Sequence, residues 1–290
     1  MQSFRLRVEP FTFEISTNID VVINNAKLIY GQSFSSDLSE NDYVDYRISI
    51  CHTNGIRRYY KPQARFLCDN REPFKPLKAS QGYALMEWGM NWVIAANELE
   101  YVIVHAGVLA KDGKAIMLPA PPGSGKSTLT AHLANSGWQL LSDELAIIVP
   151  ETGRVLPFVR PICLKNASID LAKSWFPEAV FSTIAKDTHK GDVIHLAPPK
   201  GAIDMATQSA EIVGIVYPQY TPNTQLDIYQ LSMTETFMKL AENAFNFTAR
   251  GAGSFETVTK LIERSKHFEI HYNDVNEVEA FLREDIIDAS

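Results

Sequence analysis

The sequence predicts an α/β fold whose N-terminal portion is rich in β-strands. Short runs of alternating apolar and polar residues dominate residues 1–75, and such alternation is typical of half-buried strands. Residues 101–149 instead carry apolar strands, a glycine-rich loop and a helical segment in succession. This order indicates a sheet with helices packed on it. We therefore expect two parts, a β-rich portion at residues 1–99 and a second domain at residues 100–290.

The N-terminal portion is expected to contain short strands followed by one long helix. A helix is predicted over residues 81–98, because Leu85, Trp88, Trp92 and Val93 recur at helical spacing. Large aromatic residues in such a stripe usually pack into a core. The predicted strands are residues 4–8, 11–15, 46–50 and 59–67.

The second domain is expected to mix strands with capped helices. Ser232 and Glu235 have the spacing of a capping box that opens a helix reaching about Ala244. Ser254 and Asp274 are expected to cap two further helices. The predicted strands are residues 101–109, 115–118, 138–141, 145–149, 211–217 and 225–230, and a further helix is predicted over residues 127–135.

The composition excludes several classes of protein. The 290 residues are 46% hydrophobic and 21% charged, and the formal net charge is −7, which argues against a broad nucleic-acid-binding surface. No apolar run approaches the ~20 residues that cross a bilayer, and the charged, alternating N-terminus is unlike a signal peptide. The three cysteines form no CxxC pair, so neither a zinc site nor a disulfide framework is indicated. We expect a cytoplasmic protein without nucleic-acid or membrane partners.

The segment from Ala120 to Thr128 has the pattern of a phosphate-binding loop. Gly123 and Gly125 permit the positive φ angles that turn successive backbone N–H groups towards one anion. The helix that follows adds the positive end of its dipole. The pattern arises by chance in only about 1% of chains of this length, and a preceding apolar strand supports it. The expected nucleotide-binding residues are Pro122, Gly123, Ser124, Gly125, Lys126, Ser127 and Thr128.

Individual residues of this loop have separate expected roles. Lys126 would reach the β- and γ-phosphates of ATP, and the hydroxyl of Ser127 would ligate Mg²⁺. Ala120 replaces the usual first glycine, and alanine serves there if its φ is negative. ATP and Mg²⁺ are therefore the expected cofactors.

An acidic pair and a histidine accompany the loop. Asp143 and Glu144 follow the strand after the loop's helix, where adjacent strands would bring them beside Lys126. One carboxylate can hold the metal and the other a hydroxyl acceptor, although a solvated loop pair would have the same sequence. His105 lies in an apolar strand, where a lone histidine is usually a satisfied core residue.

These residues together resemble the catalytic domain of HPr kinase/phosphorylase. The resemblance is carried by His105, by Gly107 to Leu109, by the glycine-rich loop and by the acidic pair. The spacings from His105 to Lys126 and from Lys126 to Asp143 also agree with that family. The resemblance implies a P-loop kinase core of the type shared by HPr kinases and phosphoenolpyruvate carboxykinases.

The resemblance also implies roles for the site residues. Asp143 would handle the acceptor's proton, His105 would lie in the same active site, and Glu144 would join Ser127 at the metal. Members of that family assemble into rings, so the resemblance also implies that this chain could form a homo-oligomer. Near the C-terminus, Asn246 and Phe247 resemble a further family segment.

Further basic residues could close a phosphate pocket. The sequence does not fix the identity of the phosphoryl acceptor. The candidates for a substrate or phosphate clamp are Arg160, Lys165, Lys190 and Arg250, each of which could equally be a surface charge. The sequence favours an ATP-dependent kinase acting on a hydroxyl or carboxyl group of a small anionic metabolite or a protein serine. A nucleotide-gated ATPase or binding module and a carboxykinase-like protein are the alternatives.

Overall fold

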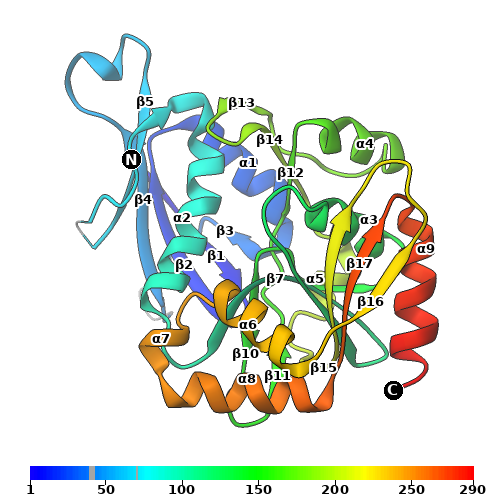
Figure 1. The fold of residues 1–290 in the computed structure, drawn as a ribbon. Coiled ribbons are helices and arrows are strands. Elements are labelled where there is room, and N and C mark those ends of the chain that lie inside the picture. The colour runs from blue at the N-terminus through cyan, green and yellow to red at the C-terminus, as the bar shows by residue number, and fades with distance from the viewer. Residues whose placement is uncertain (39–42, 70) are drawn as a thin grey trace. The chain divides into compact units, whose positions relative to one another are not determined.

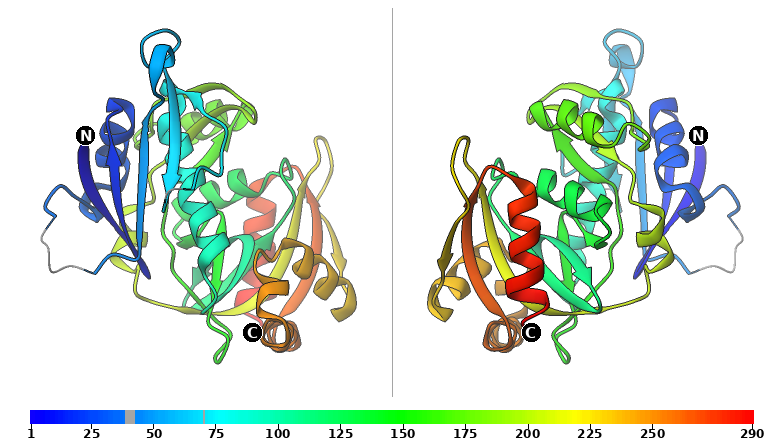
Figure 2. Two further views of the ribbon diagram at one scale, coloured as in Figure 1. Left: turned by 90° about the vertical axis from the view of Figure 1, so that its left-hand side faces the viewer. Right: turned by 90° about the vertical axis from the view of Figure 1, so that its right-hand side faces the viewer.

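The computed structural model describes residues 1–38, 43–69 and 71–290. These residues form a mixed α/β protein in which strands and helices alternate along much of the chain (Figure 1; further views in Figure 2). Within the described ranges, no helix combines the length and apolar character needed to span a membrane.

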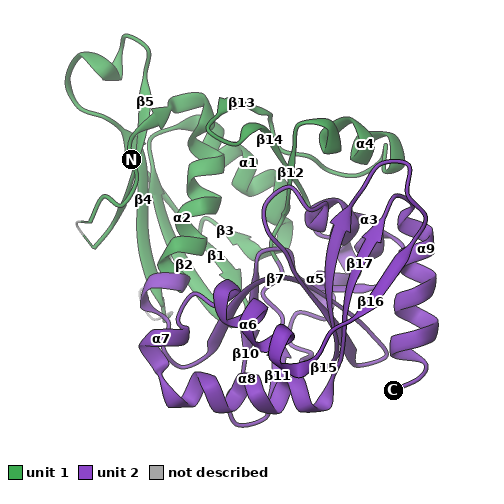
Figure 3. Ribbon diagram, viewed as in Figure 1, with its two compact units in different colours: residues 1–94, 160–197 green, residues 95–159, 198–290 purple. Residues whose placement is uncertain are grey.

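The chain folds into two compact units, each made of two separate stretches (Figure 3). Unit 1 comprises residues 1–94 and 160–197, and unit 2 comprises residues 95–159 and 198–290. The first change of unit lies close to the boundary predicted after residue 99. Residues 160–197 were predicted to belong to the second domain, but they are part of unit 1.

Unit 1 contains a sheet in which six strands of the described residues pair in the order β3-β1-β2-β4-β5-β6. The strands are β1 (Gln2–Val8), β2 (Phe11–Thr17), β3 (Phe34–Ser35), β4 (Tyr46–His52), β5 (Gln63–Cys68) and β6 (Leu77–Lys78). β2 pairs antiparallel with β1 and parallel with β4, and β5 returns antiparallel to β4. Phe4, Leu6 and Val8 are buried, as the alternation predicted.

A smaller sheet explains why residues 160–197 join unit 1. It pairs β12 (Ile162–Lys165), β14 (Gly191–Leu196) and β13 (Ala185–Thr188), and α4 (Ala167–Trp175) follows β12. Ala84 of α2 (Gly82–Asn97) shares a buried apolar cluster with Cys163 and Val193. Gln81 donates a hydrogen bond of 2.7 Å to the carbonyl of Lys186. Apolar packing and hydrogen bonding therefore hold this stretch on the N-terminal portion.

Two local features of unit 1 differ from the prediction. A helix, α1 (Asp20–Tyr30), lies in the portion expected to be strands and loops. Val22, Ala26 and Ile29 are buried along its face, which is helical spacing on one side. The strand predicted over residues 59–67 begins only at Gln63, and residues 59–62, which follow the 3₁₀ turn η2 (Gly55–Arg58), lie outside it.

Unit 2 is built on a sheet of eight strands, counted among its described residues, with the order β11-β10-β7-β8-β15-β17-β16 and with β9 beside β7. The strands are β7 (Val102–Lys111), β8 (Lys114–Pro119), β9 (Gln139–Ser142), β10 (Leu145–Ile148), β11 (Arg154–Leu156), β15 (Ala210–Tyr220), β16 (Asp227–Gln230) and β17 (Lys266–Tyr272). β15 runs parallel to both β8 and β17. The carboxyl ends of these three strands therefore meet at one edge of the sheet.

Helices cover both faces of this sheet. They are α3 (Lys126–Asn135), α5 (Lys200–Asp204), α6 (Met233–Asn243), α7 (Phe247–Arg250), α8 (Ala252–Arg264), α9 (Val275–Phe281) and the π-helical turn η4 (Leu282–Ile287). Val104 and Val108 of β7 pack in one buried cluster with Leu240 of α6 and Val258 of α8. Because side chains alternate along a strand, His105 and Gly107 point to the opposite face, where α3 lies.

The predicted helix starts of unit 2 have mixed outcomes. The capping box at Ser232 and Glu235 is confirmed, and Asp274 caps α9 by accepting a hydrogen bond from the Asn276 amide at 2.8 Å. The prediction for Ser254 is wrong. This residue is fully buried inside α8, which begins at Ala252 after Gly251.

Candidate functional site

The glycine-rich loop joins β8 to α3 at the carboxyl edge of the parallel strands. Gly123 has a φ of 91°, and Gly125, at the N-cap of α3, has a φ of 88°. These values lie in the left-handed region that only glycine adopts readily. Ala120 does not have a positive φ, which is the condition under which alanine can occupy its position. Open α/β sheets commonly bind ligands beyond the carboxyl ends of their strands.

Two tyrosines at the ends of neighbouring strands hold the loop. The Tyr220 amide donates to the carbonyl of Ser124 at 2.8 Å, and the Tyr272 hydroxyl donates to the carbonyl of Gly125 at 3.3 Å. Burial, and secondarily the neighbouring Tyr220, raises the pKa of Tyr272, so its phenol stays protonated and able to donate. A Cβ atom on Gly125 would lie 2.7 Å from the Tyr272 hydroxyl. The loop is therefore fixed by residues far along the sequence.

Lys126 lies at the centre of a polar cluster in unit 2. Its ammonium donates to the carbonyl of Asp143 at 2.7 Å and lies 3.2 Å from Nε2 of His105. The carboxylate of Glu144 is 4.0 Å away. The side chain of Lys126 is only 7% exposed, and a buried ammonium needs such partners. The structure thus brings together the four residues that the sequence analysis singled out for chemistry.

His105 has two polar neighbours at one ring nitrogen. Nε2 lies 3.0 Å from the Glu144 carboxylate and 3.2 Å from the Lys126 ammonium. A carboxylate only accepts hydrogen bonds and an ammonium only donates. Nε2 can therefore donate to Glu144 when it carries a proton, or accept from Lys126 when it does not. The presence or absence of a proton on Nε2 therefore decides which of the two charged side chains the imidazole bonds.

The turn that carries the acidic pair is fixed by the Ser142 side chain and by the backbone of β7. The Ser142 hydroxyl accepts hydrogen bonds from the amides of Glu144 and Leu145 at 3.2 and 3.0 Å. The Ala106 amide of β7 donates to the carbonyl of Glu144 at 3.2 Å. Asp143 is 2% exposed as a residue, whereas the Glu144 side chain is 27% exposed. The two carboxyl groups consequently sit in different environments.

The close approach of α3 to β7 depends on Gly107. A Cβ atom at this position would lie 2.7 Å from the hydroxyl oxygen of Thr130 and 3.6 Å from Cγ of Lys126. Such a distance to a buried hydroxyl is too short for two packed atoms. The absence of a side chain at Gly107 therefore allows α3 to place Lys126 beside His105.

Phe245 is a site residue that the sequence analysis missed. Its ring centroid lies 5.9 Å from that of His105, and its side chain is half exposed. The Phe245 amide donates to the carbonyl of Ile103 at 2.9 Å. The neighbouring Asn246 side chain accepts from the Ile103 amide and donates to the carbonyls of Glu98 and Tyr101. Residues 246 and 247 were predicted to resemble a further family segment, but the ring that lies against the histidine belongs to the preceding residue, Phe245.

The four predicted clamp residues are placed differently. Arg160 is buried in unit 1, where it donates to the Glu87 carboxylate at 2.5 Å and to the Glu87 carbonyl at 2.8 Å. It also bonds to Asn91. These bonds occupy the guanidinium inside unit 1, and an open clamp role does not fit this geometry.

The other three clamp candidates are Lys165, Lys190 and Arg250. Lys165 ends β12 in unit 1, and Lys190 places its ammonium 5.1 Å from the ring centroid of Trp88 in the same unit. Arg250 ends α7 in unit 2. The position of each of these three residues does not by itself indicate that its side chain binds phosphate.

The donor set near the loop suits a magnesium ion held jointly with phosphates. Within the described ranges, no group of three or more His, Cys, Asp or Glu side chains could hold a metal by itself. Mg²⁺ at phosphate sites is bound by one or two protein oxygens together with water and substrate. The Ser127 hydroxyl and a carboxylate of the Asp143–Glu144 turn match that chemistry.

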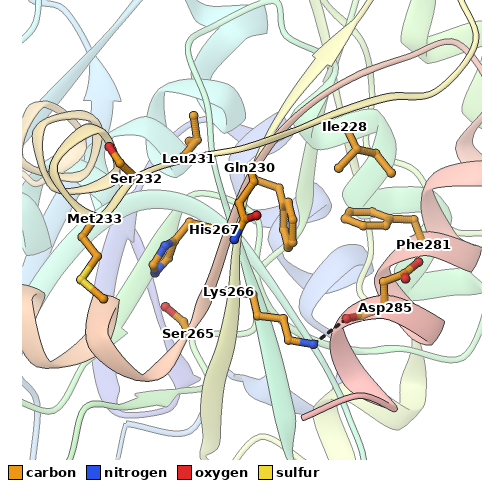
Figure 4. Close-up of a pocket in the computed structure, with 11 residues that line it drawn as sticks. Ile228, Gln230, Leu231, Ser232, Met233, Ser265, Lys266, His267, Phe281 and Asp285 are labelled. Atoms are coloured by element: carbon orange, nitrogen blue, oxygen red, sulfur yellow. Dashed lines mark hydrogen bonds between the residues drawn. The ribbon is translucent and has the colours of Figure 1, made fainter.

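A separate cavity of about 780 Å³ lies elsewhere in unit 2 (Figure 4). It is lined by residues from β16, β17 and η4, including Ile228, His267 and Asp285. Lys266 donates to the Asp285 carbonyl at its rim. β17 begins at Lys266 and ends at the loop-bracing Tyr272, so this cavity lies at the opposite edge of the sheet from the glycine-rich loop.

Comparison with known proteins identifies a family for this chain. The family model described as SynChlorMet cassette protein ScmC matches residues 79–260. This range contains the whole Lys126 cluster and the residues around Phe245. No curated protein matches the sequence significantly. Because the family model covers more than half of the chain, the protein belongs to the ScmC family of SynChlorMet cassette proteins.

Proposed function

We propose that the protein is an ATP- and Mg²⁺-dependent phosphotransferase whose active site is the Lys126 cluster. The observation that carries the proposal is the convergence of Lys126, His105 and the Asp143–Glu144 turn beside a loop with two positive-φ glycines. Phosphoryl transfer needs a phosphate cradle, a metal ligand and a group that takes the acceptor's proton. The glycine-rich loop, Ser127 with Glu144, and Asp143 would supply these three kinds of group.

The loop would bind the triphosphate. Backbone N–H groups at the start of α3 and the Lys126 ammonium would hold the β- and γ-phosphates. Ser127 and Glu144 would hold Mg²⁺, which neutralises charge on the transferred group. For Lys126 to do this, its ammonium exchanges the His105 nitrogen and the Asp143 carbonyl for phosphate oxygens. Those are stronger partners, because both sides are charged.

Asp143 would accept the proton of the attacking hydroxyl. The acceptor oxygen attacks the γ-phosphorus, the bond between that phosphorus and the bridging oxygen breaks, and ADP leaves. The hydroxyl proton passes to the Asp143 carboxylate. His105 would position Glu144 through the contact at 3.0 Å. The half-exposed Phe245 would form an apolar wall of the acceptor side.

The acceptor can be a protein serine or a small metabolite. The occupied guanidinium of Arg160 removes one cation from the anionic pocket that a small metabolite would need. Phe245 instead offers apolar surface beside His105. These two observations support an acceptor hydroxyl that is flanked by an apolar group.

The test is transfer of labelled phosphate from ATP. The protein is incubated with ATP labelled at the γ-phosphate, with Mg²⁺, and with either a metabolite panel or cell extract. Label on a protein or metabolite supports the kinase, whereas label only in inorganic phosphate would assign an ATPase. Lys126→Met should abolish both products. Lys260→Met, which removes an exposed lysine of α8, is the matched control and should leave transfer unchanged.

The role of Asp143 has a separate test. Asp143→Asn should lower the transfer rate by about two to four orders of magnitude, while Mg-ATP affinity stays near that of the parent. A variant that transfers phosphate as fast as the parent would show that another group takes the proton.

A further inference from the structure

The hairpin formed by β4 and β5 in unit 1 ends in an exposed tip, residues 55–61 (the loop beyond β5 in Figure 1, also visible in Figure 2). Ile56, Tyr59 and Tyr60 are 77%, 81% and 64% exposed. Single exposed apolar residues are common on protein surfaces. Three of them in one short loop form a patch of the kind that usually marks an interaction site.

The tip has a formed backbone. Its first residues make the 3₁₀ turn η2, and the amides of Tyr59 and Tyr60 donate to the carbonyl of Ile56 at 3.1 and 2.9 Å. The Thr53 amide donates to the Gln63 carbonyl at 3.0 Å and closes the hairpin below the tip. The exposed side chains are therefore presented from a defined turn, which lowers the entropy cost of binding.

The tip is also cationic. Arg57, Arg58 and Lys61 lie within it, and residues 54–62 contain no acidic residue, although the whole chain carries a net charge of −7. The Arg58 guanidinium lies 5.8 Å from the ring centroid of Tyr59. The Lys61 ammonium lies 5.8 Å from that of Tyr60. Two of the cations are thus paired with the two aromatic rings of the tip.

We propose that the hairpin tip is a docking site for an acidic segment of a partner protein that also carries apolar side chains. Arginine binds carboxylates through paired hydrogen bonds, and the tyrosine rings and Ile56 offer apolar contact beside them. Tyrosine and arginine are the residues most enriched at binding hot spots. The proposal does not depend on nucleotide binding by unit 2.

Two other anionic partners fit the tip less well. A nucleic acid is bound by neutralising many phosphates, and three cations on an otherwise acidic chain provide little of that. Stable attachment to a bilayer needs a lipid chain or a larger apolar insertion combined with basic residues, whereas Ile56 is the one aliphatic residue of the tip. A short acidic polypeptide segment requires only a few carboxylates and two or three apolar contacts.

The experiment measures binding of defined probes to the full chain without ATP. The first probe is a fluorescent peptide that repeats Glu-Leu-Glu, and the second has glutamine in place of every glutamate. The parent should bind only the acidic peptide, and salt should weaken that binding. Equal binding of both peptides, or no binding of the acidic one, would overturn the proposal.

Matched variants assign the binding to the tip. Replacing its three cations (Arg57→Ser, Arg58→Ser, Lys61→Asn) should weaken binding roughly tenfold or more. Replacing its apolar residues (Ile56→Ser, Tyr59→Ser, Tyr60→Ser) should do the same. Circular dichroism and thermal unfolding show whether each variant is folded like the parent.

Control variants change exposed residues elsewhere in unit 1. Lys27→Ser with Lys173→Ser removes two exposed cations, and Leu28→Ser with Leu171→Ser removes two exposed leucines. Both pairs should bind the acidic peptide as the parent does, and equal weakening in these controls would contradict docking at the tip.

Further probes test whether a membrane, a nucleic acid or a second copy of the chain binds the tip instead of an acidic peptide. Anionic phosphatidylserine vesicles and a single-stranded oligonucleotide should not bind in a manner that depends on the tip. If either does while the acidic peptide does not, the proposal fails in favour of that surface. Sedimentation of the chain alone should be unchanged by the tip variants. A change would show that a second copy of the chain occupies the tip instead.

Discussion

The Lys126 ammonium and the His105 imidazole meet at 3.2 Å, nitrogen to nitrogen. Because the ammonium can only donate, this contact is a hydrogen bond only when Nε2 of His105 carries no proton. The same nitrogen lies 3.0 Å from Glu144. The proton on one imidazole therefore decides which charged neighbour the ring engages.

Mg-ATP should remove Lys126 from this contact, because phosphate oxygens are charged acceptors for the ammonium. The ¹⁵N resonance of His105 Nε2 should shift when Mg-ATP is added. The resonance of His267, which bonds to the Ile262 carbonyl at 2.7 Å near the start of β17, should stay in place. Movement of both, or of neither, would contradict a local exchange at Lys126.

The two glycines of the loop should respond differently to the same substitution. Gly123→Ala meets no atom within 4 Å but forces alanine to a φ of 91°, which costs about 1 to 3 kcal/mol. Gly125→Ala adds contacts of 2.7 Å to the Tyr272 hydroxyl and 2.9 Å to Cβ of Tyr220. Thermal unfolding should show a larger loss for Gly125→Ala. Mg-ATP affinity measured by calorimetry should fall in the same order.

The buried ion pair of unit 1 should be sensitive to the loss of one partner. Arg160→Met leaves the Glu87 carboxylate buried without its cation, which typically costs about 3 to 5 kcal/mol. Adding Glu87→Leu should restore much of that stability, because no unpaired charge then remains. Lys78→Met breaks the exposed pair with Asp187 and should cost about 0 to 1 kcal/mol. Denaturant unfolding measures the free energy of unfolding of each variant. Equal losses for Arg160→Met and Lys78→Met would refute the prediction.

A second ion pair predicts a pH dependence of unit 2. The hydrogen bond from Lys239 at 2.6 Å lowers the pKa of Glu269. A carboxylate with a lowered folded pKa stabilises the protein above its ordinary pKa, about 4.3. That contribution is lost as the pH falls through the folded pKa.

Glu269→Gln should therefore destabilise the protein by about 0.5 to 1 kcal/mol at neutral pH, because this pair is partly exposed. The difference from the parent should vanish at acidic pH. In a Lys239→Met background the same substitution should have a smaller effect at neutral pH, because only the contact with His271 at 3.3 Å then remains. Chemical denaturation at the two pH values provides the measurement.

Local patterns predicted much of the fold. The alternation of Phe4, Leu6 and Val8 identified a strand, the stripe through Leu85 and Trp88 identified α2, and Ser232 with Glu235 identified the start of α6. Each of these signals depends on residues a few positions apart. The helix α1 was missed because its buried face is interrupted by polar residues such as Asn25, whose amide bonds to Thr183 in the segment before β13.

The sequence predicted only those site residues whose proximity follows from the spacing of motifs along the chain. The neighbourhood of Lys126, Asp143 and Glu144 follows from strand–helix–strand order, and the structure brings them together. Tyr272 and Phe245 could not be found in this way. Their contacts with Gly125 and His105 arise from pairing of strands and segments far apart in the chain, which no local pattern encodes.

The interleaving of the two units has a consequence for synthesis on the ribosome. Gly125 and its helix emerge early, whereas β15 and β17, which supply Tyr220 and Tyr272, are translated much later. Until then the nascent loop lacks the hydrogen-bond partners that fix it. Unit 2 can therefore mature only after most of the message has been read, while all strands of the six-stranded sheet of unit 1 have been synthesised by then.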